Sequence, residues 1–203
     1  MNRFEDKSVV VTGAASGFGV AIAKKFAEEG ASVLLADINL EGAEKVAAEI
    51  PGSVAIKVDV SDEEDNKAMV QAAVDNFGKI DVMCCNAGGP HRGAYMTRME
   101  VEDFDRMWAI NVRSIFLATK YCVEHMPPGS SIISTASIAG KRPRKGLTPY
   151  NASKGAVITL TKGMALELAP NIRANCVCPV SAPTGFDMLS TGKAELSKKK
   201  KKM

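Results

Sequence analysis

Near the N-terminus the chain reads Lys7-Ser-Val-Val-Val-Thr12, then Gly13-Ala-Ala-Ser-Gly17-Phe-Gly19, and then an apolar-periodic segment from Val20 to Glu29. The β-branched run predicts a short strand, the glycines predict a tight turn, and the periodic segment predicts a helix. Glycine lets a phosphate approach the backbone, and the start of a helix offers free N–H groups and partial positive charge. An ordinary strand-to-helix connection has the same local pattern, so the choice depends on the strand after the helix.

The next predicted strand, Ala31 to Asp37, ends in an acid twenty residues after Gly17. A carboxylate at this place accepts hydrogen bonds from adenosine ribose hydroxyls, as dinucleotide sites require. It also repels a 2′-phosphate, and no nearby residue supplies a compensating positive charge. The two strands therefore predict a dinucleotide site that prefers NAD to NADP. The neighbouring uncharged positions are Ala14, Ala15, Ser16 and Ile38.

A second group of residues lies far along the chain. Tyr150 and Lys154 are spaced by one helical turn, Pro149 suits the first turn of a helix, and Ser137 stands thirteen residues before Tyr150. A tyrosine ionises near pH ~10, so acid–base work at neutral pH needs a nearby cation to favour its anion. A surface pair without function has the same spacing, and the pair alone therefore decides nothing.

Five motifs occur together in one order: Thr12-Gly13-x-x-x-Gly17-x-Gly19, Asn86-Ala-Gly88, Asn111, Ser137 and Tyr150-x-x-x-Lys154. This arrangement resembles the short-chain dehydrogenase/reductase family, whose glycine spacing differs from the G-x-G-x-x-G of other dinucleotide folds. The match runs from about Lys7 to Thr184. The resemblance implies a nicotinamide-dependent oxidoreductase that acts on an alcohol or a carbonyl group.

The resemblance also implies four catalytic residues. Ser137 would hold the substrate oxygen by a hydrogen bond, and Tyr150 would give or take the proton. Lys154 would bind the nicotinamide ribose and lower the pKa of the tyrosine. Asn111 would hold a water molecule that links this lysine to solvent.

Cofactor-binding residues are implied along much of the chain. Asp59-Val60 follows the third predicted strand and looks like the family's adenine contact, although an acid that caps the next helix would look the same. The small residues Asn86-Ala-Gly88 end the fourth strand, where the cofactor ribose would approach. The expected set is Gly13, Ser16, Gly17, Phe18, Gly19, Asp37, Ile38, Asp59, Val60, Asn86, Ala87, Gly88, Tyr150, Lys154, Val180 and Thr184.

Strand and helix patterns alternate along the chain without a linker. Near-continuous apolar strands between helices predict an α/β fold, a doubly wound parallel sheet of the Rossmann type with its ligands beyond the carboxyl ends of the strands. The remaining predicted strands are 53–58, 80–85, 130–135 and 172–178, and the remaining predicted helices are 40–50, 63–77, 101–121 and 149–168.

The end of the chain departs from the family pattern. Val180 stands where the family has glycine, while Thr184 keeps the register of a nicotinamide contact. The family continues with further helices and a seventh strand, so we expect a C-terminally shortened sheet of six strands with an exposed edge. We also expect one domain over residues 1–190 and a disordered lysine-rich tail over residues 191–203.

Composition agrees with one domain and excludes several classes of protein. The chain has 203 residues with 46% apolar content, enough for one sizeable core. No apolar stretch is long enough for a membrane span and no signal peptide is visible, so a cytoplasmic protein without a membrane partner is expected. The five cysteines are odd in number and suit buried strand positions, which argues against a disulfide framework and a metal site.

The net charge of +3 would be −2 without the five lysines from Lys198 to Lys202. A slightly acidic body argues against a nucleic-acid partner. Lys141-Arg-Pro-Arg-Lys145 adds four positive charges between Ser137 and Tyr150, either as a solvated loop or as an attraction for an anionic substrate.

The sequence therefore predicts an NAD-dependent oxidoreductase that transfers a hydride between nicotinamide and a small alcohol or ketone, in a chain that forms homo-oligomers. Two alternatives stay open. One is a shortened, catalytically poor cofactor-binding chain, and the other is a 3-oxoacyl-carrier-protein reductase, for which Asp37 is awkward because many such reductases use NADPH.

Overall fold

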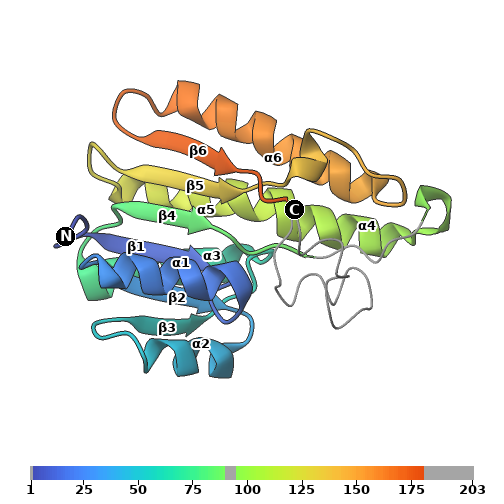
Figure 1. Ribbon diagram of the computed structural model, residues 1–203. Helices are drawn as coiled ribbons and strands as arrows, with labels where there is room; N and C mark the ends of the chain where they lie inside the picture. The colour runs from blue at the N-terminus through green and yellow to red at the C-terminus, as the bar shows by residue number, and fades with distance from the viewer. Residues whose placement is uncertain (1, 90–94, 181–203) are drawn as a thin grey trace.

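The computed structural model describes residues 2–89 and 95–180, and in that part of the chain six parallel strands form one sheet with helices on both faces (Figure 1). The order in the sheet is β3-β2-β1-β4-β5-β6. The doubly wound sheet predicted from the sequence is confirmed. The strands are β1 Ser8–Thr12, β2 Ser32–Asp37, β3 Val54–Lys57, β4 Val82–Cys85, β5 Ser131–Thr135 and β6 Arg173–Val177.

The strands form where apolar side chains can be buried on both faces of the sheet. Every residue of β1 is buried, and β2 is buried except at its two ends. Each strand begins or ends one or two residues inside the range predicted from its composition, because pairing with the neighbouring strand sets its limits.

Helices cover the two faces unequally. Helices α1 (Gly17–Glu28) and α2 (Leu40–Ala47) pack on one face, where their buried residues share a core with Val9, Val33 and Leu35. Helices α3 (Glu63–Phe77), α5 (Ser114–Cys122) and α6 (Thr148–Glu167) pack on the other, around Val10, Leu34 and Ile132. Alternate residues of one strand thus supply the two cores.

The predicted helix over 101–121 is interrupted in the structure. It consists of α4 (Val101–Trp108), a π-helical turn η2 (Ala109–Arg113) and α5. A π turn holds one residue more than an α turn, which a pattern of apolar residues does not reveal, and such turns are frequent at functional sites. Three 3-10 turns complete the described elements: η1 Met96–Arg98, η3 Val123–His125 and η4 Ile138–Gly140.

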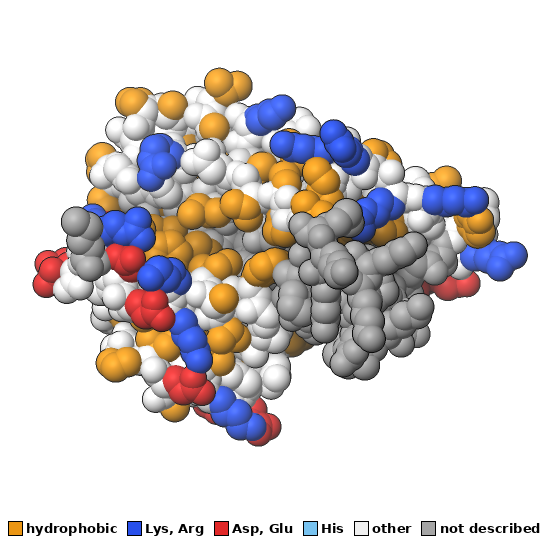
Figure 2. Space-filling model, viewed as in Figure 1, with side chains coloured by type: hydrophobic (Ala, Val, Ile, Leu, Met, Phe, Trp, Pro, Cys, Tyr) orange, Lys and Arg blue, Asp and Glu red, His pale blue; other side chains and the backbone are white. Residues whose placement is uncertain are grey.

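Within residues 2–89 and 95–180, helices cover only part of the sheet face that carries α1. Lys–Glu ion pairs lie along α1 and α2, whereas a band of apolar side chains lies beside them over the strands (Figure 2). On the edge strand β6, Arg173, Asn175 and Val177 are exposed while Ala174 is buried. Within the described residues, β6 is therefore an edge strand with one open face, and a strand edge of this kind can pair with other chains.

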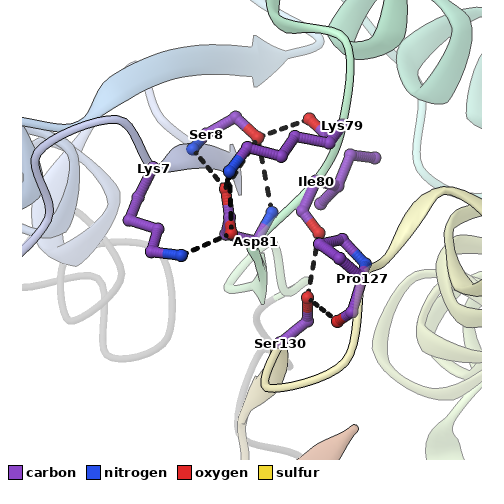
Figure 3. A network of polar contacts seen from close by, with 7 residues as sticks. All are labelled: Lys7, Ser8, Lys79, Ile80, Asp81, Pro127 and Ser130. Carbon is purple, nitrogen blue, oxygen red and sulfur yellow. Dashed lines mark hydrogen bonds and ion pairs between the residues drawn. The ribbon is translucent and has the colours of Figure 1, made fainter. Parts of the chain in front are cut away.

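A buried carboxylate ties the amino ends of β1 and β4 together (Figure 3). Asp81 accepts hydrogen bonds from the backbone N–H of Ser8 at 3.0 Å and from the ammonium of Lys7 at 3.0 Å, and it forms an ion pair with Lys79 at 3.0 Å. Burial raises the pKa of Asp81, but these hydrogen bonds outweigh burial and hold the pKa below its usual value. The network lies at the end of the strands opposite the predicted ligand site.

All five cysteines are free thiols, and three of them are buried. The expectation that they do not form a disulfide framework is confirmed for these residues. Among the helices that the structure describes, none has the length and apolar character to cross a membrane. The predicted tail over residues 191–203 lies outside the described residues.

Candidate active site

The strand order reverses between β1 and β4, and such switch points are where open α/β sheets bind ligands. At the end of β1, the Thr12 hydroxyl accepts hydrogen bonds from the N–H groups of Asn86 and Ala87, each at 3.0 Å. Gly13 has φ 66°, and a Cβ added there would lie 2.9 Å from Cα of Ala87. Two predicted cofactor segments, from β1 and β4, therefore touch, and this contact requires glycine.

The N-terminus of α1 is open to an anion. Ser16 precedes the helix in an extended conformation, makes no capping hydrogen bond with its side chain, and no acid stands in the first turn. Ser16, Gly17 and Phe18 are exposed. A Cβ added at Gly19 would lie 1.9 Å from the carbonyl oxygen of Gly13, so the helix packs directly on the glycine turn. Uncapped N–H groups in this position suit a phosphate.

The carboxylate of Asp37 is hydrogen-bonded to the backbone of the glycine turn. One carboxylate oxygen accepts a hydrogen bond from the N–H of Ala15 at 2.9 Å, and the other accepts from the N–H of Asn39 at 2.9 Å. The next residue, Ile38, is 59% exposed. The carboxylate is thus fixed beside the turn, and it stabilises the turn as well as standing where the ribose was predicted to bind.

The sequence allowed two interpretations of Asp59, an adenine contact or a cap of the next helix, and the structure tests the second. Asp62, and not Asp59, caps α3, because its side chain accepts a hydrogen bond from the N–H of Asp65 at 2.9 Å. Asp59 instead accepts a hydrogen bond from the N–H of Ser61 at 2.9 Å. Val60 is buried in the core. The helix-cap alternative is excluded, and the adenine contact stays a prediction.

Ser137 and Tyr150 are brought together by β5 and α6. Ser137 follows β5 and precedes η4, where its Oγ accepts a hydrogen bond from the N–H of Ala139 at 3.1 Å. Tyr150 stands in the first turn of α6, and the neighbouring Ser137 side chain acts to lower the pKa of its phenol. The tyrosine is 8% exposed and packs in a small cluster with Met107 and Ala139. The hydroxyl groups of Ser137 and Tyr150 are therefore partly shielded from water.

The predicted lowering of the Tyr150 pKa by Lys154 stays a prediction. Burial raises the pKa of Tyr150, and neither the Ser137 side chain nor the charge of Arg144 reverses this rise. The ammonium of Lys154 lies 6.0 Å from the centroid of the tyrosine ring and donates a hydrogen bond to the carbonyl of Thr135 at 2.8 Å. The cation is therefore directed toward β5, and the phenol of the chain is protonated at neutral pH.

Lys154 is itself unusual because it is 3% exposed. Burial lowers its pKa to about 8, since a charged amine loses hydration in the interior. A Cβ added at Gly88 would lie 3.4 Å from the lysine Nζ and 3.3 Å from Oδ1 of Asn111. Gly88, Asn111 and Lys154, all predicted from the sequence, therefore meet at one place.

Asn111 is held inside the π-helical turn and is 1% exposed. Its Oδ1 accepts a hydrogen bond from the N–H of Gly89 at 2.9 Å, and its Nδ2 donates to Oγ of Ser153 at 3.2 Å. The Ser153 hydroxyl in turn donates to the carbonyl of Tyr150 at 2.9 Å. A chain of hydrogen bonds thus joins the segment after β4 to the first turn of α6.

Sequence reasoning missed three residues that shape the site. Thr135 supplies the carbonyl that binds Lys154, and Ser153 links Asn111 to Tyr150. Gly140 lets η4 lie against α6, because a Cβ there would be 2.6 Å from the carbonyl carbon of Lys154. The glycine was visible in the sequence, but nothing local indicated which backbone would approach it.

The remaining predicted residues lie after β6. Val180 is 65% exposed, and the carbonyl of Pro179 before it accepts a hydrogen bond from the N–H of Ile138 at 3.1 Å. Thr184 lies outside the described residues. In the described ranges, no three side chains of His, Cys, Asp or Glu are grouped as a metal site would require.

A glycine turn, an acid at the end of β2 and a Ser–Tyr–Lys group at the carboxyl end of the sheet are features that known proteins share. The family model described as short chain dehydrogenase matches residues 7–194. The chain belongs to this family. It is therefore an oxidoreductase of a nucleotide-binding family that acts on CH–OH and keto groups, as the five sequence motifs indicated.

Individual members of the short chain dehydrogenase family resemble the chain over most of its length. An uncharacterised oxidoreductase, YxbG of Bacillus subtilis, is 39% identical over 190 residues, which cover 91% of this chain and 70% of that protein. The crystal structure of a 3-ketoacyl-(acyl-carrier-protein) reductase from Brucella melitensis complexed with NADH has a TM-score of 0.89 and 39% identity, with 93% of this chain and 81% of that chain covered. A short chain dehydrogenase from Burkholderia cenocepacia in complex with NADP has a TM-score of 0.87 and 32% identity, with 94% and 79% covered.

Proposed function

We propose that the chain is an NAD-dependent dehydrogenase or reductase that moves a hydride between nicotinamide and a small alcohol or ketone. The observation that carries this proposal is the placement of Ser137, after β5, beside Tyr150, in the first turn of α6, at the carboxyl end of the sheet. Membership of the family supplies the reaction class, and the side chains of this chain supply the proton chemistry.

In the reducing direction, the phenol of Tyr150 gives its proton to the oxygen of the carbonyl, so that an alcohol forms. A phenol is protonated at neutral pH, and burial raises its pKa further, so Tyr150 carries the proton that this step requires. The Oγ of Ser137 already accepts a bond from the backbone, which leaves its own hydrogen to donate to the substrate oxygen or to the tyrosine. The nicotinamide, when bound, supplies or accepts the hydride.

Lys154 and Asn111 hold the other side of this proposed site. An ammonium has three donors, and one is used for the carbonyl of Thr135. We assign the remaining donors to the ribose hydroxyls of the nicotinamide half of the cofactor. Asn111 fixes Gly89 and Ser153, and so it keeps the glycine segment after β4 at the correct distance from Lys154.

The cofactor assignment depends on the fit of the residues around the glycine turn. The uncapped N-terminus of α1 suits a pyrophosphate, and Gly13 lets the turn before this helix lie against Ala87, where an added Cβ would be 2.9 Å from Cα. Asp37 favours NAD because its carboxylate repels a 2′-phosphate. Related structures contain either NADH or NADP, so this preference is a property that we assign from the side chains of this chain alone.

The test measures initial rates with NADH and with NADPH over a panel of ketones. The absorbance of the nicotinamide reports each rate. Turnover with NADH, and a kcat/KM at least ~10-fold higher than with NADPH, supports the proposal. Equal kcat/KM values with NADPH and NADH would contradict the role assigned to Asp37 in cofactor preference. Tight binding of NADH without turnover of any substrate would favour the alternative of a cofactor-binding chain with little catalytic activity.

A reductase of acyl-carrier-bound ketones is the second candidate. It is favoured by the likeness to the reductase from Brucella melitensis, whose name states that activity. The same panel should therefore include a 3-oxoacyl thioester bound to a carrier protein, and a clear preference for it over free ketones would decide for this candidate.

Self-association is the last part of the proposal. Phe116 on α5 is 53% exposed and Leu166 on α6 is 83% exposed, on helices that cover the same face of the sheet. Contact between two copies would bury such side chains. Light scattering after size exclusion should show more than one chain per particle for the wild type and a shift toward monomer for Leu166→Lys. The cytoplasmic location stays a prediction.

A further inference from the structure

The loop between η4 and α6 carries four positive charges that the described chain leaves unpaired. Lys141, Arg142, Arg144 and Lys145 are all exposed, and none forms an ion pair with an acid in residues 2–89 or 95–180. Elsewhere on the surface, lysines such as Lys24 and Lys67 are paired with glutamates. The loop therefore concentrates positive charge next to Tyr150 without neutralising it.

The backbone of this loop is anchored. The N–H of Arg142 donates to the carbonyl of Ile138 at 2.8 Å. The carbonyl of Arg144 accepts from Nδ2 of Asn151 at 2.9 Å and from the N–H of Leu147 at 3.2 Å. Asn151 is buried and directly follows Tyr150 in α6. The base of the Arg144 side chain is thus held at a set distance from the reactive phenol.

The guanidinium of Arg144 also acts on that phenol. Its positive charge lowers the pKa of Tyr150 against the larger opposite effect of burial. The carbonyl of Arg144 is hydrogen-bonded to the side chain of Asn151, the residue after Tyr150, so its charge is carried beside the first turn of α6. In the same loop, the ammonium of Lys145 lies 5.7 Å from the ring centroid of Tyr95, and Tyr95 and Met96 are 55% and 60% exposed.

We propose that the substrate of Tyr150 carries a carboxylate, which Arg144 binds while the carbonyl or hydroxyl carbon faces Ser137 and Tyr150. This inference rests on the function proposed above and narrows its substrate to small oxo acids and hydroxy acids. A guanidinium presents two parallel donors that match a planar carboxylate. The second cation, Lys145, draws the anion to the site and need not touch it. Arg144 is here a binding residue that determines specificity, and the proton still passes through Tyr150.

The experiment compares short oxo acids with their neutral methyl esters as substrates, with NADH as reductant. For the wild type, kcat/KM should be higher for each acid than for its ester, and the advantage should fall as the salt concentration rises. Arg144→Gln should lower the acid-to-ester ratio of kcat/KM by about 10- to 100-fold, the loss expected for a charge-assisted hydrogen-bond pair. A change in the pKa of Tyr150 would alter the rates with acid and ester alike. The acid-to-ester ratio of kcat/KM therefore cancels that effect.

Arg142→Gln is the matched control, because it removes the same charge from the same loop at a position that does not act on Tyr150. It should leave the ratio within about twofold of wild type. If Arg142→Gln and Arg144→Gln lower the ratio equally, only the overall charge of the loop matters and the assigned contact is wrong. Turnover of esters without any preference for acids would overturn the inference while leaving the proposed function intact.

A binding measurement covers the case in which no substrate in the panel is turned over. Trp108 is the single tryptophan of the chain and packs against the cluster that contains Tyr150, so its fluorescence should respond when a ligand binds there. In the presence of NADH, oxo acids should change this signal with a Kd that rises at least ~10-fold in Arg144→Gln. No response, or a Kd independent of Arg144, would overturn the inference. A preference for a 3-oxoacyl thioester bound to a carrier protein over all free acids would also overturn the inference.

Discussion

Gly140 lies against the backbone of Lys154: a Cβ added to the glycine would stand 2.6 Å from the lysine carbonyl carbon and 2.7 Å from the N atom of Gly155. This contact presses η4, which begins after Ser137, onto the helix that carries Tyr150 and Lys154. The positions of three predicted catalytic residues therefore depend on a glycine between them that has no chemical role.

Gly140→Ala is expected to lower the free energy of unfolding by about 1–3 kcal/mol and to reduce kcat, because the added methyl group must push η4 away from α6. Gly163→Ala is the matched control. It lies inside α6 with nothing within 4 Å of an added Cβ, and should stabilise the protein by about 0.5–1 kcal/mol. Urea unfolding and steady-state rates measure both. Equal stability of the two variants would show that the contact is less tight than described.

Tyr150→Phe should decrease kcat by at least ~100-fold, since the ring still packs with Met107 and Ala139 but carries no transferable proton. The Kd for NADH should stay within about twofold of wild type. Fluorescence titration with NADH and initial rates with an active ketone give the two numbers. A variant that keeps most of its activity would remove Tyr150 from the proposed mechanism.

Asp37→Asn should raise kcat/KM with NADPH relative to NADH by about 10-fold or more, because the negative charge beside the glycine turn is removed. The variant should also lose some stability, since the N–H groups of Ala15 and Asn39 lose a charged acceptor. Glu41→Gln, an exposed acid in the first turn of α2, is the control and should not change the cofactor ratio. An unchanged ratio in Asp37→Asn would contradict the cofactor assignment.

Lys154→Met should abolish turnover and yet stabilise the folded protein at pH 7.5 by about 1–3 kcal/mol, because a buried cation is replaced by an apolar side chain. The pKa of Lys154 is about 8 in the folded chain and 10.5 as its ordinary value, so folding opposes its protonation. This cost is fully present below pH 8 and is relieved as the pH rises toward 10.5.

The advantage of Lys154→Met over wild type should consequently shrink between about pH 7.5 and pH 10 in urea unfolding experiments. Lys162→Met replaces an exposed lysine of the same helix and controls for the loss of a positive charge. A stability difference for Lys154→Met that does not depend on pH would show that the lysine is not held in the way the structure indicates.

Asp81→Asn should destabilise the protein by about 1.5–3 kcal/mol at pH 7, because hydrogen bonds from Lys7, Lys79 and the Ser8 N–H lose their charged acceptor. The pKa of Asp81 is lowered in the folded chain, so its contribution is present above the ordinary value of 3.8 and is lost as the pH falls through the folded value.

Thermal unfolding from about pH 7 to pH 3 should therefore show the difference between wild type and Asp81→Asn decreasing only at the acid end. Glu124→Gln, an exposed acid in η3, should match wild type over the whole range. A difference that vanishes already near pH ~6 would assign the effect to a group other than this carboxylate.

The parallel sheet, its doubly wound topology and the order of the functional motifs could all be predicted from the amino-acid sequence. Apolar runs such as 8–12, and the glycines after them, are local signals, because burial on both faces of a strand and positive φ in a turn leave a direct mark on residue choice. Spacing along one helix also placed Tyr150 and Lys154 in successive turns of α6.

The directions of the side chains at those positions, and their surroundings, became visible in the folded chain alone. Folding directed Lys154 to the carbonyl of Thr135, buried Tyr150 so that its pKa rises, and brought Gly140 against α6. Desolvation and close backbone contact depend on segments that are distant in the sequence. A motif can therefore name the residues of a site, but the free energies that tune them arise from the packing of the whole chain.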